Sequence, residues 1–583
     1  MPGLDLQARA GLCFPMASSD FSPLTRRPTA AEASPFAQRV ALLAALHVAA
    51  LAVMAWTETD LVAKTAFLLA WGTVNFIWLA LLRRPSVAAA LSLALLAILV
   101  LLSRFKYDVL QMTVNFVDVM VIEPDTIAYL FALFPSLGIA VGAAVVVAAP
   151  LLAAIWWFDP FRIPRAHALG GALACTAGLT MLSFAAPFEA HESFYGGNHV
   201  SHFARSGVDA VSALMSEGFL ESDAVVEDRL RSAPDAACSP AGRPPHIIMV
   251  HDESSFDIRA APGIRVPPGY GAHFRSFDGK ERKLVVETAG GASWYTEYNV
   301  LTGLSARSFG RFAYFVTRIA AHRVERGLPL ALRRCGYRTY SIYPWHGAFM
   351  SARSFQATTG IEHFFDSKDL GARGFEPDRF YYEAATRLIA REHRDGPMFL
   401  LVYLAANHFP WDSRYRPELT PDWQEPGNAA RIDEYLRRQA MSLRDYGQLL
   451  AHLRENFPGE SFLLVRYGDH QPEFAPHIME PTLDKAAVAR RLAAFDPTYF
   501  TTYYAIDVIN FSPPSLALAL DTLEGPYLPL VVQEAAGVAL DPSFAEQKRI
   551  LLRCGGAFHG CAGGAEARRF NRLLINAGLV KGL

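Results

Sequence analysis

Five long apolar runs without a charged residue constrain the fold of this chain more than any other feature. Each run approaches or exceeds the ~20 residues that a helix needs to cross a bilayer. Core helices of soluble proteins seldom lack charge over a whole run, so five such runs in succession predict five transmembrane helices. The fourth run is too short for two spans and a turn. The runs are Val40–Trp56, Thr65–Leu82, Ser86–Ser103, Thr126–Phe158 and Ala168–Pro187.

Basic residues flank these runs unevenly and predict their orientation. They precede the first run and lie between the second and third and between the fourth and fifth: Arg26, Arg27, Arg39, Arg83, Arg84, Arg162 and Arg165. These positions share one side of the membrane, which the positive-inside rule makes cytoplasmic. Arg104 and Lys106, after the third run, are an exception. Five spans place the chain beyond about Phe188 outside the cytoplasm, so we expect a multi-pass membrane protein with a cytoplasmic N-terminus and an extracytoplasmic domain.

The composition of the whole chain is an average over an apolar part and an ordinary soluble part. The chain is 52% hydrophobic and 19% charged, and its formal net charge is -2. This balance does not suit a nucleic-acid partner, which usually requires a basic surface. The predicted parts are a disordered cytoplasmic tail, a five-span domain, a connector with an interfacial helix, and an extracytoplasmic catalytic domain: residues 1–38, 39–187, 188–245 and 246–583.

Short β-rich runs alternate with amphipathic helices in the soluble part. The expected strands are His246–His251, Lys283–Thr288, Thr339–Tyr343, Met398–Leu404, Phe462–Tyr467 and Thr501–Ile509. The expected helices include Val324–Cys335, Tyr381–Glu392, Ala430–Glu455 and Ala565–Ala577. Such alternation predicts an α/β domain with a largely parallel sheet. The chemistry of such a sheet lies at the carboxyl ends of its strands.

Polar residues at three of these strand ends suit a divalent cation. Asp252 and Glu253 close the first strand, and neighbouring residues on a strand point to opposite faces, so we expect only one of them to bind. Asp469 and His470 follow the fifth strand and offer an oxygen and an imidazole nitrogen. Together with Glu253 and the hydroxyl of Ser293, they make a set of four candidate ligands.

Ser293 follows the second strand and a glycine pair, at the expected start of a helix. Helix N-termini favour anions such as phosphate. The commoner role of a serine here is to cap the helix, and the functional alternative is a nucleophile activated by a metal. His408 follows the fourth strand, and His346 and Arg353 follow the third. These three suit anion binding and proton donation to a leaving group.

These segments, in this order, resemble the alkaline phosphatase/sulfatase superfamily. They are most similar to its membrane-anchored phosphotransferases, such as lipoteichoic-acid synthases and phosphoglycerol transferases. The most specific segments are Gly-Ala-Ser-Trp-Tyr-Thr-Glu-Tyr around Ser293 and Tyr-Gly-Asp-His before Gln471. The resemblance implies a mainly parallel central sheet flanked by helices, and a protein of the bacterial cytoplasmic (inner) membrane whose catalytic domain is periplasmic or extracellular. It also implies the metal ligands Glu253, Ser293, Asp469 and His470.

The resemblance further implies roles for the remaining candidates. Ser293 would be the nucleophile, His408 would contact the substrate or leaving group, and His346 and Arg353 would hold a phosphoglycerol head. The close relatives usually carry Thr as nucleophile, and Thr296 is a fallback with poorer spacing. The aromatic residue expected just before Arg353 is missing. The Cys/Ser-x-Pro-x-Arg signature of true sulfatases is absent, so sulfate-ester hydrolysis is not expected.

The expected activity is metal-dependent transfer of a phospho-head group of the phosphoglycerol or phosphoethanolamine type. The donor would be a membrane phospholipid, the acceptor an envelope glycan or lipid, and the intermediate a covalent adduct of Ser293. The expected cofactor is one divalent metal ion. Manganese is the preferred candidate, and zinc and magnesium are also compatible with the ligands. The alternatives are a membrane-tethered phosphatase or phosphodiesterase, and a non-catalytic homologue.

Two cysteines near the C-terminus flank a glycine-rich turn. Cys554 and Cys561 have a spacing that suits a local disulfide in an oxidising compartment. The alternative is a pair of unbridged thiols, and we expect the bridge.

Overall fold

The computed structural model describes residues 30–110, 112–121, 127, 130–131, 134–187, 194, 196–216, 218–231 and 244–583. Its N-terminal part holds five helices that are long and apolar enough to span a membrane, which confirms the predicted spans. Part of the fourth predicted run, including Thr126, lies outside the described residues. The helices are α1 (Ala30–Thr57), α2 (Leu61–Leu82), α3 (Pro85–Leu110), α5 (Pro135–Phe158) and α6 (Arg165–Ala185).

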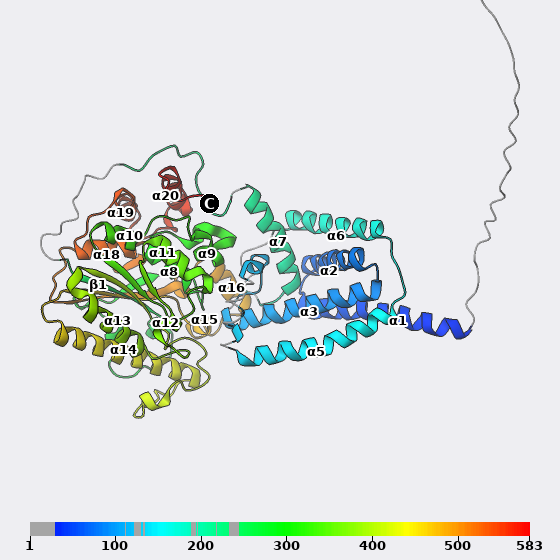
Figure 1. The fold of residues 1–583 in the computed structure, drawn as a ribbon, viewed down its shortest axis with the longest axis horizontal. Helices are drawn as coiled ribbons and strands as arrows, with labels where there is room; N and C mark the ends of the chain where they lie inside the picture. The colour runs from blue at the N-terminus through cyan, green and yellow to red at the C-terminus, as the bar shows by residue number, and fades with distance from the viewer. Residues whose placement is uncertain are drawn as a thin grey trace, which may run out of the picture.

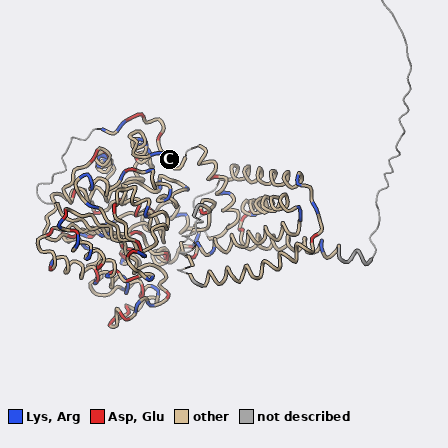
Figure 2. Tube along the Cα trace, viewed as in Figure 1, with Lys and Arg blue, Asp and Glu red and all other residues tan. Residues whose placement is uncertain are grey.

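Several boundaries differ from those expected, and two of them matter below. Helix α1 begins at Ala30, within the expected tail, and α3 continues past Ser103 to Leu110. Arg104 and Lys106 therefore lie on the last turns of α3, at the end nearest the α/β domain. Figure 2 shows charged residues gathered in that domain and near the ends of the membrane helices. The apolar middle of each helix is what allows it to cross a bilayer.

Helix α7 (His199–Ser216) lies between the membrane helices and the α/β domain (Figure 1). Its first turn is held by Glu58 of the α1–α2 turn. The Glu58 carboxylate accepts hydrogen bonds from the backbone N–H of Val200 at 3.1 Å and from the Ser201 hydroxyl at 2.5 Å. This carboxylate satisfies donors that a helix start otherwise leaves unpaired. The connector is thereby fixed to the membrane domain.

The α/β domain is built on an eight-stranded sheet in the order β4-β3-β5-β1-β6-β7-β2-β8. All strand pairs are parallel except the two that involve β7, which confirms the predicted, largely parallel sheet. The sequence pattern missed β4 and β8, because three residues are too few to show a period. The strands are β1 (His246–Asp252), β2 (Arg282–Val285), β3 (Arg338–Ile342), β4 (His363–Phe365), β5 (Met398–Tyr403), β6 (Phe462–Gly468), β7 (Thr501–Ile509) and β8 (Thr522–Glu524).

The strand directions bring the candidate residues to one edge of the sheet. Strands β1, β3, β5 and β6 run parallel to one another. Strand β7 is antiparallel to both β6 and β2, so β2 runs in the same direction as β6. The carboxyl ends of β1, β2 and β6 therefore face the same edge. Glu253, Ser293, Asp469 and His470 all follow these ends.

Helices cover both faces of the sheet (Figure 1). Along β1, Ile247 and Met249 pack into one core, whereas Ile248 and Val250 pack into the other. This alternation follows from the period of two along a strand, and it explains why β1 is apolar throughout. Helices α13 (Asp378–Glu392) and α14 (Ala430–Asn456) cover the second core, and α8 (Trp294–Thr302), α10 (Leu328–Arg334) and α18 (Leu528–Ala536) cover the first.

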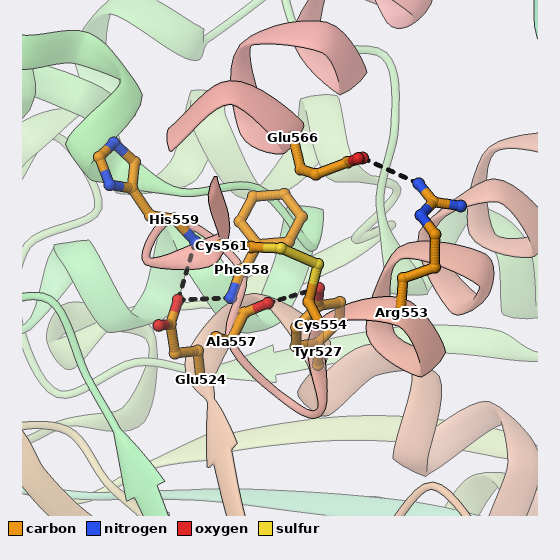
Figure 3. Close-up of a disulfide and its surroundings, with 9 residues drawn as sticks. All are labelled: Glu524, Tyr527, Arg553, Cys554, Ala557, Phe558, His559, Cys561 and Glu566. Atoms are coloured by element: carbon orange, nitrogen blue, oxygen red, sulfur yellow. Dashed lines mark hydrogen bonds and ion pairs between the residues drawn. A yellow bond between two sulfur atoms is a disulfide. The ribbon is translucent and has the colours of Figure 1, made fainter. Parts of the chain in front are cut away.

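The C-terminal segment closes the domain with the expected disulfide. Cys554 and Cys561 are bridged between α19 (Pro542–Cys554) and α20 (Ala565–Asn576). Figure 3 shows the bridged turn held from below by Glu524 at the end of β8. The Glu524 carboxylate accepts the backbone N–H groups of Phe558 and His559 at 2.8 and 2.9 Å. The turn is thus tied both covalently and to the edge of the sheet.

Candidate active site

Three of the candidate metal ligands meet at the shared carboxyl edge of β1 and β6. Glu253 directly follows β1, and Asp469 and His470 directly follow β6. The Nε2 atom of His470 lies 3.5 Å from Oε1 of Glu253 and 3.3 Å from Oδ2 of Asp469. Ligand atoms of all three buried residues lie within 4.8 Å of one another. One cation would reach all three side chains.

The two carboxylates at the end of β1 separate as strand alternation predicts. Asp252 points away from the cluster, and its Oδ2 accepts from His273 Nε2 at 2.9 Å and from the Tyr503 hydroxyl at 2.5 Å. Glu253 faces the cluster and accepts the Ser254 hydroxyl at 2.8 Å. Only Glu253 is therefore placed to bind a cation there.

His251 also belongs to this cluster, although it was not among the predicted site residues. Its Nε2 lies 3.3 Å from Oδ2 of Asp469, and its ring stacks on Tyr403. His251 precedes Glu253 by two residues, so the period of a strand puts both on one face and would have revealed it. The His251 Nε2 and Asp469 Oδ2 atoms are buried, and their approach does not have the geometry of a hydrogen bond, so neither atom has a hydrogen-bond partner. A cation bound by Asp469 would satisfy its unpaired oxygen.

The charges of the cluster also fit a divalent cation. Burial lowers the pKa of His470, but the carboxylates of Asp469 and Glu253 outweigh burial and raise it to about 9. Burial raises the pKa of Asp469, but His470 and His251 lower it to about 2. The His470 Nδ1 donates to the Gln471 carbonyl at 2.8 Å, which leaves Nε2 toward the carboxylates. A divalent cation would replace the Nε2 proton, as metal binding generally does.

A turn with unusual backbone conformation carries Ser293 to the cluster. Gly290, Gly291 and Ala292 have positive φ values of 77°, 154° and 61°. Residues with a side chain seldom adopt such values, and conformations of this kind gather at functional sites. The Gly290 N–H donates to the carbonyl of Gln471 at 3.0 Å. The turn is thereby attached to the segment that supplies Asp469 and His470.

The Ser293 hydroxyl faces the candidate ligands and does not cap its helix. Ser293 stands directly before α8 but makes no side-chain capping hydrogen bond. Its Oγ lies 3.4 Å from Oε2 of Glu253 and 3.3 Å from Nε2 of His470. The hydroxyl thus joins two carboxylates and an imidazole at the N-terminus of α8. This arrangement favours the nucleophile over the plain helix cap.

Thr296, the fallback nucleophile, is engaged elsewhere. Its side chain is fully buried, and its hydroxyl donates to the backbone carbonyl of Asp469 at 2.6 Å. This contact fixes the end of β6 against α8. Thr296 therefore supports the position of Asp469, whereas Ser293 presents the accessible hydroxyl.

His408 lies on the loop that follows β5. Its Nδ1 donates to the carbonyl of Phe409 at 2.8 Å, so the other ring nitrogen is available for proton transfer. Burial lowers the pKa of His408, although the charge of Glu253 acts in the opposite direction. The neighbouring Asn407 side chain donates to the carbonyl of Ser254 at 3.3 Å, which links this loop to the cluster. The His408 ring also packs against Trp345 and Phe375.

The two candidates after β3 lie in more exposed positions. His346 and Arg353 are both exposed. The Arg353 guanidinium donates to Asp366 at 2.8 Å and to Asp369 at 3.2 Å, and it stacks over Phe364. Two carboxylates already form ion pairs with the Arg353 guanidinium, so a phosphate would have to compete with them. The head-group roles of His346 and Arg353 stay predictions.

The sequence profile of the Sulfatase family matches residues 288–496. This part of the α/β domain is therefore similar to sulfatases. The matched segment begins just before the Ser293 turn and includes Asp469 and His470. The match confirms the resemblance to the alkaline phosphatase/sulfatase superfamily and the prediction of a sulfatase-like enzyme. The chain thus combines five helices that are long and apolar enough to anchor it in a membrane with a sulfatase-like domain C-terminal to them.

Two curated relatives match parts of the chain. An uncharacterized protein from Haemophilus influenzae is 26% identical over 212 residues, covering 33% of this chain and 37% of that protein. The capsular polysaccharide biosynthesis protein RkpI from Rhizobium meliloti is 28% identical over 278 residues, covering 43% of this chain and 47% of RkpI. The matches thus span less than half the length of each relative.

Solved structures resemble this chain at low sequence identity. The Streptococcus pyogenes phosphoglycerol transferase GacH has a TM-score of 0.44 and 15% identity, covering 59% of this chain and 88% of its own. The phosphoethanolamine transferase EptA from Neisseria meningitidis has a TM-score of 0.44 and 12% identity, covering 81% of this chain and 95% of EptA. The lipoteichoic acid synthase LtaP from Listeria monocytogenes has a TM-score of 0.40 and 15% identity, covering 54% of this chain and 77% of LtaP.

Proposed function

We propose that this protein is a membrane-anchored phosphotransferase with Ser293 as its nucleophile. The observation that carries the proposal is the Ser293 hydroxyl, which does not cap α8 and lies 3.4 Å from Glu253 and 3.3 Å from His470. The backbone N–H groups and dipole at the start of α8 favour an anionic phosphate there. A hydroxyl beside candidate cation ligands at such a place suits attack on a phosphate.

Glu253, Ser293, Asp469 and His470 would hold one divalent cation. Two carboxylates, an imidazole and a hydroxyl accept manganese, zinc or magnesium, and we propose manganese. When bound, the cation lowers the pKa of the Ser293 hydroxyl and polarises the phosphate. His251 acts as a positioning residue, because its Nε2 lies 3.3 Å from the Asp469 carboxylate.

The proposed reaction has two steps that balance their protons. In the first, Ser293 releases its hydroxyl proton to solvent and bonds to phosphorus, the bond between phosphorus and the lipid alcohol oxygen breaks, and protonated His408 gives its proton to the leaving alcohol. In the second, neutral His408 takes the proton of the acceptor hydroxyl, whose oxygen bonds to phosphorus, the bond to Ser293 breaks, and Ser293 takes back a proton from solvent. Burial lowers the pKa of His408 and favours the neutral form that acts as base in the second step, whereas the charge of Glu253 acts in the opposite direction and favours the protonated form that the first step needs.

The position of the site supports a phospholipid donor. A Cβ atom at Gly291 would lie 2.5 Å from the Leu110 side chain, so the Ser293 turn touches the end of α3. A lipid in the membrane would meet this turn at high effective concentration. The match to a capsular polysaccharide biosynthesis protein supports an envelope glycan as acceptor. We further propose that the sulfatase domain faces away from the cytoplasm, where the Cys554–Cys561 bridge would persist.

The second candidate is a membrane-tethered phosphodiesterase, which the Sulfatase family match favours. Water would then take the phosphoryl group from Ser293. The residues after Ser293 are Trp-Tyr-Thr-Glu, which do not form the Cys/Ser-x-Pro-x-Arg signature of true sulfatases. A phosphate ester therefore remains the proposed substrate class in either case.

The test uses the full chain in liposomes with head-group-labelled phosphatidylglycerol or phosphatidylethanolamine. We expect diacylglycerol release that a chelator abolishes and manganese restores. Ser293→Ala should lower the rate by at least ~1000-fold, the scale of loss of a catalytic nucleophile. Ser512→Ala, an exposed serine of the same domain, is the matched control. Undiminished release by Ser293→Ala refutes the proposal, and stimulation by an added glycan separates transfer from hydrolysis.

A further inference from the structure

A cavity of about 420 Å³ lies where the membrane helices meet the α/β domain. Its lining comes from the ends of α1 and α3, the segment before α7, and α16 (Lys485–Ala493). Figure 1 shows α16 beside the end of α3. None of the candidate catalytic or metal residues lines this interfacial cavity. Lining residues that matter here are Trp56, Arg104, Tyr107, Asp108, His199 and Lys485.

Two cations of the interfacial cavity are available to a ligand. The Arg104 guanidinium lies over the Trp56 ring at 4.8 Å, and the Lys485 Nζ lies 5.8 Å from the Tyr107 ring centre. Within the part of the chain that the structure describes, neither cation forms a salt bridge. Lys106 differs, because it pairs with an aspartate at 2.7 Å. Aromatic faces hold a cation in place and leave its N–H donors for an anion.

The interfacial cavity lies at the level of the lipid head groups. Trp56 stands one residue before the end of α1, and Arg104 stands on the last turns of α3, each a candidate span. Tryptophan and tyrosine are enriched at this level of a bilayer. Arg104 and Leu110 are about 9 Å apart along the helix axis, and Leu110 touches the Ser293 turn. The cavity is thus close to the active site and distinct from it.

We propose that the interfacial cavity binds the phosphate of a membrane phospholipid through Arg104 and Lys485. Guanidinium and ammonium groups are strong donors to phosphate oxygens, and arginine binds them with a fork of two parallel bonds. Asp108 supplies one opposing carboxylate, and burial, followed by the charge of Arg104, lowers the pKa of His199 to about 4, so this histidine is neutral. Two cations against one carboxylate leave a net positive cavity.

Such a lipid would join the two parts of the protein. Arg104 belongs to a membrane helix, whereas Lys485 begins a helix of the sulfatase domain. Val488 and Leu492 of that helix pack in a cluster with Ala289, which precedes the Ser293 turn. A phosphate held by both cations would therefore fix the height of the active site above the bilayer. It also explains why Arg104 breaks the positive-inside pattern. The inference concerns binding and does not depend on the proposed reaction.

The experiment is native mass spectrometry of the full chain, stripped of lipid in detergent and titrated with phosphatidylglycerol. We expect one tightly retained lipid, with about tenfold weaker binding in Arg104→Gln and in Lys485→Gln. Arg104→Lys should restore part of the affinity. Arg162→Gln is the matched control, because Arg162 is an exposed arginine beside the opposite ends of the membrane helices, and it should bind like the wild type.

Two outcomes overturn the inference. Equal lipid retention by the wild type and both glutamine variants would show that Arg104 and Lys485 do not bind the lipid phosphate. Displacement of the lipid by excess inorganic phosphate makes the cavity a site for a free anion. If Arg104→Gln does not fold, Lys485→Gln still decides, because Lys485 is an exposed residue of α16. Diacylglycerol release is not measured, so failure here is distinguishable from failure of the proposed reaction.

Discussion

The substitution Gly468→Ala tests how the fold builds the active site. A methyl group at Gly468 would lie 1.8 Å from the carbonyl oxygen of Ser255 and 3.1 Å from Cβ of Thr502. The Ser255 oxygen belongs to the backbone, so no change of side-chain rotamer relieves this clash. An ordinary contact is at least 3.4 Å, and the two segments must therefore separate by about 1.6 Å.

This separation would act directly on the candidate metal ligands. Glu253 lies on the Ser255 side of the contact, and Asp469 and His470 follow Gly468 on the other side. Misplacement of catalytic groups by about 1 Å costs ~100-fold in rate, so we expect turnover to fall by at least that factor. Overpacking of this kind lowers the free energy of unfolding by ~1–3 kcal/mol, and a backbone clash belongs at the upper end.

Three measurements on the detergent-solubilised full chain check this prediction. They are manganese content by elemental mass spectrometry, the melting temperature, and release of diacylglycerol. Gly459→Ala is the matched control, because a methyl group there meets no atom within 4 Å. The variant Gly468→Ala should lose metal and activity, and the control should lose neither. Wild-type metal content and turnover in Gly468→Ala would refute the reasoning about this close approach.

Three further predictions concern the disulfide, a buried acid and the metal. Cys554→Ser should lower the free energy of unfolding by ~2–3 kcal/mol under non-reducing conditions, since it reopens a short loop, and a reductant should abolish the difference in melting temperature. Burial, followed by the charge of Asp252, raises the pKa of Asp378 from 3.8 to about 8. Ionisation of this carboxyl therefore favours the unfolded chain, so its contribution to the free energy of unfolding is full below about pH 4 and is lost as the pH rises through about 8. Asp378→Asn should therefore flatten the decline of the melting temperature over that range, and an unchanged profile contradicts the assignment. His251→Ala should weaken metal affinity by ~10–100-fold, measured by competition with a chelating dye, as loss of an outer partner generally does.

The sequence predicted those features that depend on local periodicity. Charge-free runs identified the five spans, because a bilayer admits few charged residues. Alternation along β1 separated Asp252 from Glu253, and the structure confirms that they point apart. The rule that parallel strands place their chemistry at their carboxyl ends brought Glu253, Asp469 and His470 together in advance.

Other features depend on contacts between distant segments, which no local pattern records. The two edge strands, β4 and β8, are three residues each, and only pairing with a neighbour defines them. The two carboxylates that occupy Arg353 come from the segment that follows β4. Whether a serine at a helix start caps the helix or faces a metal site depends on what the fold places beside it.

The charge-free runs and the strand-end residues by themselves determined that this chain has a membrane anchor and a sulfatase-like domain. Only the tertiary structure decided that the Ser293 hydroxyl faces Glu253 and His470, that His251 supports Asp469, and that Gly468 must lack a side chain. The physical reason is one of range. Hydropathy and strand alternation act over a few residues, whereas these contacts join segments that lie 40 to 218 residues apart in the chain.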